Sequence, residues 1–125
     1  MRTIGTKKAD IFEQDDKSVV DIKTVTDTSS ATPTPTGDAT TNNYYLTALA
    51  TDPTFAAPSG TPALGNSLYM EITATGATRT LAWNAVYVDG NTHSLPTEVA
   101  AGDTIRVGFK YDGSEWVLVA LDVPA

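Results

Sequence analysis

Residues 68–89 read LYMEITATGATRTLAWNAVYVD, and this stretch indicates how the chain folds. Two runs in which apolar and polar residues alternate flank Thr75-Gly76, a dipeptide typical of a tight turn. The pattern predicts a β-hairpin that pairs Leu68 with Trp83, because cross-strand pairs on one face stabilise a sheet. We therefore expect Trp83 to lie in the core. A one-residue slip would turn the apolar side chains to solvent, so this register is well specified.

The C-terminal part of the chain predicts a second hairpin. Asp112-Gly113 is a typical two-residue turn, and with it Phe109 faces Trp116. A three-residue loop with a glycine bulge would shift this register, and both arrangements remain open.

The last predicted strand is apolar on both faces, and its second face carries Val117, Val119 and Leu121. A strand of this kind is covered on both sides. Burial within a sandwich would explain the pattern, and so would contact with another subunit or a partner. These three residues are therefore candidate subunit contacts.

Further short strands are expected at residues 44–49 and 54–57, between loops rich in Pro and Gly. Roughly six to eight short strands separated by turn signals, without a convincing helical pattern, predict an all-β domain over residues 43–125. We expect a small antiparallel β-sandwich or jelly-roll-like barrel, preceded by an extended N-terminal arm. A domain of this size buries a modest share of its surface, so oligomerisation or docking would add to its stability.

Residues 1–42 differ in character and predict an N-terminal arm with a Thr- and Pro-rich linker. Residues 26–42 are almost free of large apolar side chains, so they cannot offset the entropy lost on ordering. They would form a disordered linker, or an extended arm that is ordered only against a partner. Before them, residues 19–25 are β-branched enough for a short strand. The apolar residues expected to contact a partner are Ile11, Phe12, Val19, Val20, Ile22 and Val25.

The composition limits the classes of function. The chain of 125 residues has 8 basic and 15 acidic side chains and a net charge of -7, which argues against nucleic-acid binding because Lys and Arg neutralise phosphates. It has no cysteine, so disulfides and thiolate metal sites are excluded. It has neither an apolar run of the ~20 residues that span a bilayer nor the apolar segment of a secretory signal. We therefore expect a protein made in the cytoplasm without a membrane partner.

No set of residues predicts catalysis, a metal site or a cofactor. His93 is the single histidine, and its neighbour Ser94 would point away from it in an extended segment. Glu13, Asp15 and Asp16 form an acidic run that is typical of a solvated segment.

Two local patterns have both a structural and a functional interpretation. The Asp-Gly sequences at residues 89–90 and 112–113 are typical of turns and lack the spaced acidic ligands of a calcium loop. Tyr45, Trp83 and Tyr87 would form a platform for a sugar ring if they were exposed together, but core packing is the expected role of Trp83.

The order of several motifs resembles a β domain found in virion structural proteins of tailed bacteriophages. The motifs are YYLTAL at residues 44–49, FAAPSGTPALGNSLYMEI at 55–72, GATRTLAWNAVY at 76–87 and LPTEVAAGDTIRVGFKYDGSEWVLVA at 95–120. The family has a similar order: an Ala-Pro-x-Gly-x-Pro loop, a Thr-Leu-x-Trp-Asn strand, a Leu-Pro-Thr step and a closing strand with Trp near Leu-Val-Ala. Such domains resemble parts of capsid decoration proteins, head fibres and tail fibres.

The resemblance implies a non-enzymatic protein of the virion surface. We expect a capsid decoration or head-fibre protein that binds the major capsid protein through its N-terminal arm and stabilises the shell. A homo-oligomer is also expected, with a trimer favoured. The competing expectation is a tail-fibre or tail-tip adhesive domain that binds a bacterial surface glycan through loops such as residues 89–95.

Overall fold

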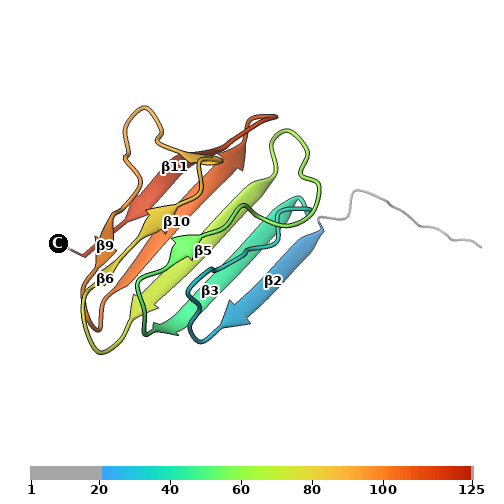
Figure 1. Cartoon of the computed structure of the whole chain (residues 1–125). Coiled ribbons are helices and arrows are strands. Elements are labelled where there is room, and N and C mark those ends of the chain that lie inside the picture. The colour runs from blue at the N-terminus through green and yellow to red at the C-terminus, as the bar shows by residue number, and fades with distance from the viewer. Residues whose placement is uncertain (1–20, 125) are drawn as a thin grey trace, which may run out of the picture.

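The computed structural model of the chain describes residues 21–124, which form ten β-strands and no helix (Figure 1). The longer strands are β2 (Ile22–Asp27), β3 (Thr41–Leu49), β5 (Ser67–Ala74), β10 (Thr104–Tyr111) and β11 (Trp116–Asp122). The short strands are β4 (Thr54–Phe55), β6 (Arg79–Thr80), β7 (Ala82–Trp83), β8 (Tyr87–Val88) and β9 (Glu98–Val99). This architecture confirms the predicted all-β fold class.

Six of the strands form one sheet in the order β2-β3-β5-β10-β11-β8. β10 pairs antiparallel with both β5 and β11, whereas the other neighbours in the sheet pair parallel. The sheet is therefore mixed, where an antiparallel one was expected. Because β2 and β11 run in the same direction, the start of β2 and the end of β11 lie at opposite ends of the sheet (Figure 1).

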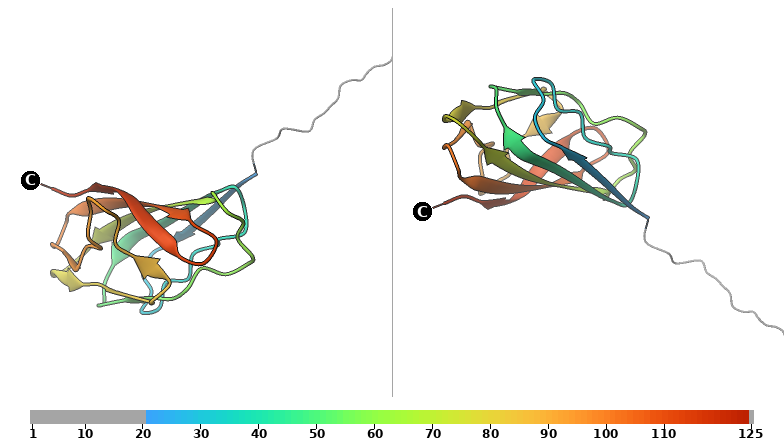
Figure 2. Two further views of the ribbon diagram at one scale, coloured as in Figure 1. Left: turned by 90° about the horizontal axis from the view of Figure 1, so that it is seen from above. Right: turned by 90° about the horizontal axis from the view of Figure 1, so that it is seen from below.

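A second layer covers one face of this sheet (Figure 2). It consists of two small strand pairs, β4 parallel to β7 and β6 antiparallel to β9, and of the segments that connect them. Apolar side chains from both layers meet in one core, as in a small β-sandwich with one regular and one irregular layer. The buried core residues are Tyr44, Leu46, Leu49, Phe55, Leu68, Met70, Ile72, Ala74, Leu81, Tyr87, Val99, Ile105, Val107, Phe109, Trp116 and Leu118.

The turn at Gly76 connects the two layers instead of two neighbouring strands. Gly76 has the positive φ of 79° expected of a turn, but β5 pairs with β3 and β10 and not with the chain that follows. The predicted hairpin is thus wrong, since past the turn β6 pairs with β9 and Leu81 is buried in the core. Apolar residues that alternate along a chain can meet face to face across a core as well as side by side within a sheet.

Trp116, and not Trp83, is the largest fully buried side chain. Trp83 lies half-buried in the second layer, where its ring stacks on Phe55 with a centroid separation of 4.3 Å. Its indole Nε1 donates a hydrogen bond of 2.8 Å to the Pro96 carbonyl. The expected core position of Trp83 is therefore correct only in part, because the ring packs against the core but stays partly exposed.

The C-terminal hairpin forms as predicted but in a different register. Its turn holds residues 112–115, so that Phe109 faces Leu118 rather than Trp116. The Asp112 carboxylate closes this longer turn by accepting hydrogen bonds of 2.9 and 2.7 Å from two backbone N–H groups within it. These bonds stabilise a longer loop than the two-residue turn that the Asp-Gly dipeptide suggests.

Residues 28–40 lie along the second layer as an extended segment. The carbonyls of Ala31, Pro33 and Pro35 accept hydrogen bonds of 2.9, 2.9 and 2.8 Å from backbone N–H groups in and after β4. Both prolines are buried. Proline cannot donate a backbone hydrogen bond, but its carbonyl accepts one and its ring buries apolar surface. This segment therefore belongs to the folded domain, in place of the linker expected over residues 26–42.

β2 joins the sheet as an edge strand next to β3. The Tyr44 hydroxyl donates a hydrogen bond of 2.6 Å to the Asp27 carboxylate and so ties the two strands together. The folded domain consequently includes residues 21–42, so it begins before the boundary that was expected at residue 43. Of the strand predicted over residues 19–25, the part from Ile22 onward corresponds to β2.

Candidate functional site

The face of the six-stranded sheet that points away from the core is not covered by any described element (Figure 2). Residues in register on neighbouring strands share a face, so side chains on this outer face form rows across the sheet. One row is Tyr45, Glu71, Arg106 and Asp122, and the next is Asn43, Tyr69, Gly108 and Ala120. These two rows place aromatic and charged side chains together on an open surface.

Two ion pairs fix the charged row. Arg106 Nε lies 3.5 Å from the Glu71 carboxylate, and Arg106 Nη1 lies 3.2 Å from the Asp122 carboxylate. The Glu71 charge and the hydrogen bond to Asp122 raise the pKa of Arg106 above its ordinary value. Exposed ion pairs contribute little to stability, so their main effect here is to orient the guanidinium. Together the three groups carry one net negative charge.

The ring of Tyr69 is held from two sides. Its hydroxyl donates a hydrogen bond of 2.7 Å to the Glu71 carboxylate, and the Tyr45 ring meets it edge-on with centroids 6.3 Å apart. Burial and the hydrogen bond to Glu71 raise the pKa of Tyr69 to about 12. These two contacts hold the Tyr69 ring in one orientation.

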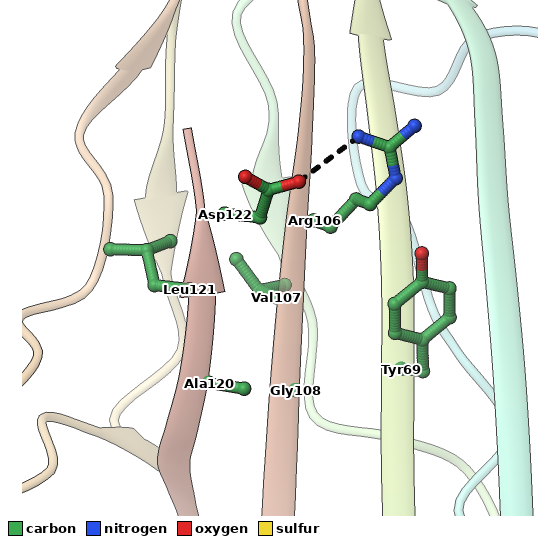
Figure 3. Close-up of a pocket in the computed structure, with 7 residues that line it drawn as sticks. All are labelled: Tyr69, Arg106, Val107, Gly108, Ala120, Leu121 and Asp122. Atoms are coloured by element: carbon green, nitrogen blue, oxygen red, sulfur yellow. Dashed lines mark hydrogen bonds and ion pairs between the residues drawn. The ribbon is translucent and has the colours of Figure 1, made fainter. Parts of the chain in front are cut away.

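A shallow hollow of about 220 Å³ lies beside Tyr69 (Figure 3). Gly108 and Ala120 form its floor, and Arg106 and Asp122 stand at one end of it. A Cβ atom on Gly108 would lie 3.3 Å from the Ala120 side chain, so a larger residue at this position would begin to fill the hollow. Glycine within a strand is typical of a place where another group approaches closely.

A β-bulge at Val119 places Ala120 on this floor. On one side of the bulge Phe109 faces Leu118, and on the other side Gly108 faces Ala120, so Val119 has no partner on β10. Without the bulge Val119 would face Gly108, and its larger side chain would occupy the hollow. Bulges are over-represented next to binding sites because they re-aim side chains in this way.

The aromatic platform expected from Tyr45, Trp83 and Tyr87 does not form. Tyr45 lies on the outer face, whereas the Trp83 and Tyr87 rings pack against Phe109 with centroids 5.8 and 5.2 Å from it. The Tyr87 hydroxyl donates a hydrogen bond of 2.7 Å to the Ala56 carbonyl, and burial raises the pKa of Tyr87. The buried Tyr87 ring is therefore part of the core and not of a binding surface.

The loop that contains His93 is held by its own hydrogen bonds. The Asp89 carboxylate accepts one of 2.7 Å from the Leu95 N–H, and the Gly90 N–H donates one of 2.9 Å to the His93 carbonyl. Within residues 21–124, no three His, Cys, Asp or Glu side chains are placed to hold a metal ion. The acidic run that lies outside the described residues consists of Glu13, Asp15 and Asp16.

A second hollow, of about 390 Å³, lies between residues 89–92 and β11. Val117 and Val119 line it, and Val119 is 51% exposed. Leu121 is in register with the buried Val107 and packs against the core. The structure therefore does not bring the three candidate subunit contacts onto one face.

Two of the residues predicted to contact a partner lie in the described chain. Ile22 is 60% exposed at the start of β2, whereas Val25 packs against the core. Among the described strands β2 pairs with β3 alone, so its other edge presents unpaired backbone groups. The predicted contacts that lie outside the described residues are Ile11, Phe12, Val19 and Val20.

Sequence reasoning did not single out Tyr69, Gly108 or Arg106. One signal was available, because Gly108 interrupts an otherwise regular strand pattern. The alignment of the three residues depends on which strands are neighbours, and the alternation of apolar residues does not contain that information.

Comparisons with protein-family models, curated proteins and solved structures find no match for this chain. Over residues 21–124 there is no helix with the length and apolar character needed to cross a membrane. A functional proposal therefore rests on the geometry described above and on the resemblance of the motifs.

Proposed function

We propose that the chain is a non-enzymatic structural protein of a virus particle, namely a capsid decoration or head-fibre protein. In this proposal residues 1–20 together with β2 bind the major capsid protein, and the β domain stands on the outer surface of the shell and stabilises it. The resemblance of residues 44–120 to a domain of tailed-phage virion proteins supports the proposal. Synthesis in the host cytoplasm precedes attachment to the capsid.

The position of β2 is the observation that carries the proposal. Residues 1–20 enter the domain at the start of β2, which lies at an edge of the sheet. A segment bound at this point leaves the outer face of the sheet accessible. The free edge of β2 also offers backbone N–H and C=O groups to which a strand from a capsid subunit can add.

Self-association, with a trimer expected, is part of the proposal. Val119 and Val123 are 51% and 50% exposed, and they lie in and just after the part of β11 that β8 does not reach. Exposed apolar residues near a strand edge favour contact with another copy. Light scattering after size-exclusion chromatography measures the mass, and a monomer at every concentration would remove the trimer from the proposal.

Binding to particles tests the proposal as a whole. The full chain and a chain without residues 1–20 are mixed with capsids of the virus that encodes them and are separated by sedimentation. Because β2 begins at Ile22, the shortened chain keeps every described strand, and circular dichroism checks that it is folded. We expect the full chain to sediment with the capsids and the shortened chain to stay in solution. Equal binding by both chains contradicts the proposal.

Point variants of the full chain locate the contact. Ile11→Asp combined with Phe12→Asp removes two apolar side chains and is expected to abolish sedimentation with the capsids. Gln14→Asp is the matched control, because it adds a charge nearby without removing an apolar side chain, and it should bind as the unaltered chain does.

A second candidate function is an adhesive domain of a tail fibre or tail tip that binds a bacterial surface glycan. The hollow beside Tyr69 favours this candidate, because an aromatic ring and charged side chains meet there on an open surface. The sequence placed such binding in the loop at residues 89–95. Cryo-electron microscopy of the virion distinguishes the two candidates by locating the chain on the head or on the tail.

A further inference from the structure

We propose that the hollow beside Tyr69 binds one pyranose ring of a neutral, hydroxyl-rich glycan. The inference goes beyond attachment to a capsid, because the site lies on the outer face of the sheet and not at the edge of β2. It also differs in place from the loop at residues 89–95, where the sequence suggested glycan binding.

The apolar part of the hollow fits one face of a sugar ring. A pyranose presents C–H bonds on its face and hydroxyl groups around its rim. The Tyr69 ring and the floor of Gly108 and Ala120 offer the C–H bonds an apolar surface. Tyrosine is favoured at recognition surfaces because its ring packs against apolar groups while its hydroxyl keeps a polar partner. A volume of about 220 Å³ is small for a ligand pocket and suits a single ring of a longer chain.

The polar part of the hollow fits the rim of the sugar. Arg106 and Asp122 stand together at one end (Figure 3), and each is a planar group with two or more atoms available for hydrogen bonding. A guanidinium and a carboxylate side by side can donate to one hydroxyl and accept from its neighbour. Hydrogen bonds to charged groups are stronger than those between neutral groups.

The charge of the site selects a neutral glycan. Glu71, Arg106 and Asp122 carry one net negative charge, and the whole chain carries -7. The net negative charge would repel a sugar with a phosphate, sulfate or carboxylate group. Arg106, the cation that could pair with such a group, already pairs with two carboxylates. A neutral sugar has no such penalty.

The site is organised before the ligand arrives. Glu71 and Tyr45 hold the Tyr69 ring, and two carboxylates hold Arg106. The bulge at Val119 keeps the floor open. Binding to side chains that are already ordered loses less conformational entropy, which favours recognition even of a small ligand.

The direct test is titration of the full chain, labelled with nitrogen-15, by nuclear magnetic resonance. The probes are linear trisaccharides of glucose, mannose, galactose, rhamnose and N-acetylglucosamine at millimolar concentration, with sialyllactose and trigalacturonate as anionic comparisons. We expect at least one neutral trisaccharide to shift the amide signals of Tyr69, Gly108, Ala120 and Asp122. The anionic sugars should leave them unchanged. The free protein is used, so this result does not depend on attachment to a capsid.

Two substitutions, each with a matched control, identify the site. Tyr69→Ala should weaken binding by about tenfold through loss of the ring, whereas Tyr69→Phe keeps the ring and should stay within about threefold. Ala120→Leu should also weaken binding by about tenfold or more, because the exposed side chain fills the hollow. Ala82→Leu is its matched control, since Ala82 is an exposed strand residue of the second layer and the same substitution adds equal bulk outside the hollow. Thermal unfolding checks that each variant is folded.

Four outcomes would overturn the inference. One is that no trisaccharide of the panel shifts the amides of the outer face. Another is that the shifts appear in the loop at residues 89–95 instead. A third is that Ala120→Leu, although folded, binds as the unaltered chain does. The fourth is that the outer-face signals broaden with protein concentration in the absence of sugar, which would make this face an interface between copies.

Discussion

The hydroxyl of Tyr44 and the carboxylate of Asp27 lie 2.6 Å apart and join the edge strand β2 to β3. Tyr44 is fully buried and Asp27 is half-buried, so the bond forms at the margin of the core. We expect Tyr44→Phe to lower the free energy of unfolding by about 1–2 kcal/mol, because a hydrogen bond to a charged group is lost while the ring stays packed. Urea denaturation followed by tryptophan fluorescence measures this change.

Tyr45→Phe is the matched control for that substitution. The two tyrosines are neighbours in sequence, but Tyr45 lies on the outer face of the sheet. We expect its change in unfolding free energy to stay within about 0.5 kcal/mol. Equal effects of the two substitutions would show that the bond to Asp27 does not stabilise the fold.

The two tryptophans should differ in their contributions to stability. Trp116→Ala is expected to lower the free energy of unfolding by about 3–5 kcal/mol, because it leaves a cavity in place of a fully buried side chain. Trp83→Ala should cost less, about 1–3 kcal/mol, because the ring is only half-buried, although it loses its stacking on Phe55 and one hydrogen bond to the Pro96 carbonyl. Denaturation curves with equal slopes allow the comparison, and a larger effect at Trp83 would contradict the assignment of Trp116 as the main aromatic of the core.

The segment at residues 28–40 predicts a pattern of hydrogen exchange. The amides of Thr54, Ala56 and Ser59 donate to the carbonyls of this segment, so they should exchange orders of magnitude more slowly than in an unstructured peptide. A linker in place of the segment would leave these three amides open to solvent. Exchange at the rate of an unstructured peptide would therefore contradict the packing described here.

Three tyrosines make stability sensitive to alkaline pH. Burial and the Asp27 hydrogen bond raise the pKa of Tyr44, burial raises that of Tyr87, and burial with the Glu71 hydrogen bond raises that of Tyr69 to about 12. A folded-state pKa above the unfolded value of 10.0 stabilises the fold fully below pH 10.0. This stabilisation is lost as the pH rises through 10.0 toward 12 and above.

Absorbance of the phenolate and circular dichroism, recorded together during an alkaline titration, check this prediction. We expect loss of structure to begin above pH 10.0 and to accompany late ionisation of tyrosine. Tyr69→Phe should remove the ionisation step near pH 12. Stability that does not change between pH 10 and 12 would contradict the assignment.

Local patterns in the sequence predicted the strands better than their partners. The alternation in β5 is correct, because Leu68, Met70 and Ile72 are all buried. The partner was wrong, because the chain after Gly76 crosses to the second layer instead of returning beside β5. Alternation determines which face of a strand is buried, but side chains on that face pack equally well against a neighbour in the sheet or against the opposite layer.

The extended segment was missed for a different reason. Its composition offers few apolar side chains, and these alone do not offset the entropy cost of ordering the segment. The contribution that was left out is the backbone, whose carbonyls at Ala31, Pro33 and Pro35 pair with the strand region that follows. Threonine- and proline-rich sequences therefore remain compatible with a folded position whenever an adjacent edge has N–H groups to donate.

The sequence did not predict the outer-face hollow, because the hollow depends on one unpaired residue as well as on Gly108. Val119 shifts the register of β11 against β10, and this shift brings Ala120 opposite Gly108. A uniform register would have placed Val119 there. The position of such a bulge depends on the packing of the whole sheet, and no single residue in the sequence predicts it.

The start of β2 and the end of β11 lie at opposite ends of the sheet, so the domain separates whatever is attached at these two points. β5 has eight residues, and at ~3.3 Å for each residue a strand of this length measures about 26 Å. β2 and β11 also lie four strands apart, so cargo fused behind β11 would stand farther than that from the start of β2. With the start of β2 held on a surface, as proposed above, an enzyme or an epitope attached behind β11 would lie on the side of the domain away from that surface.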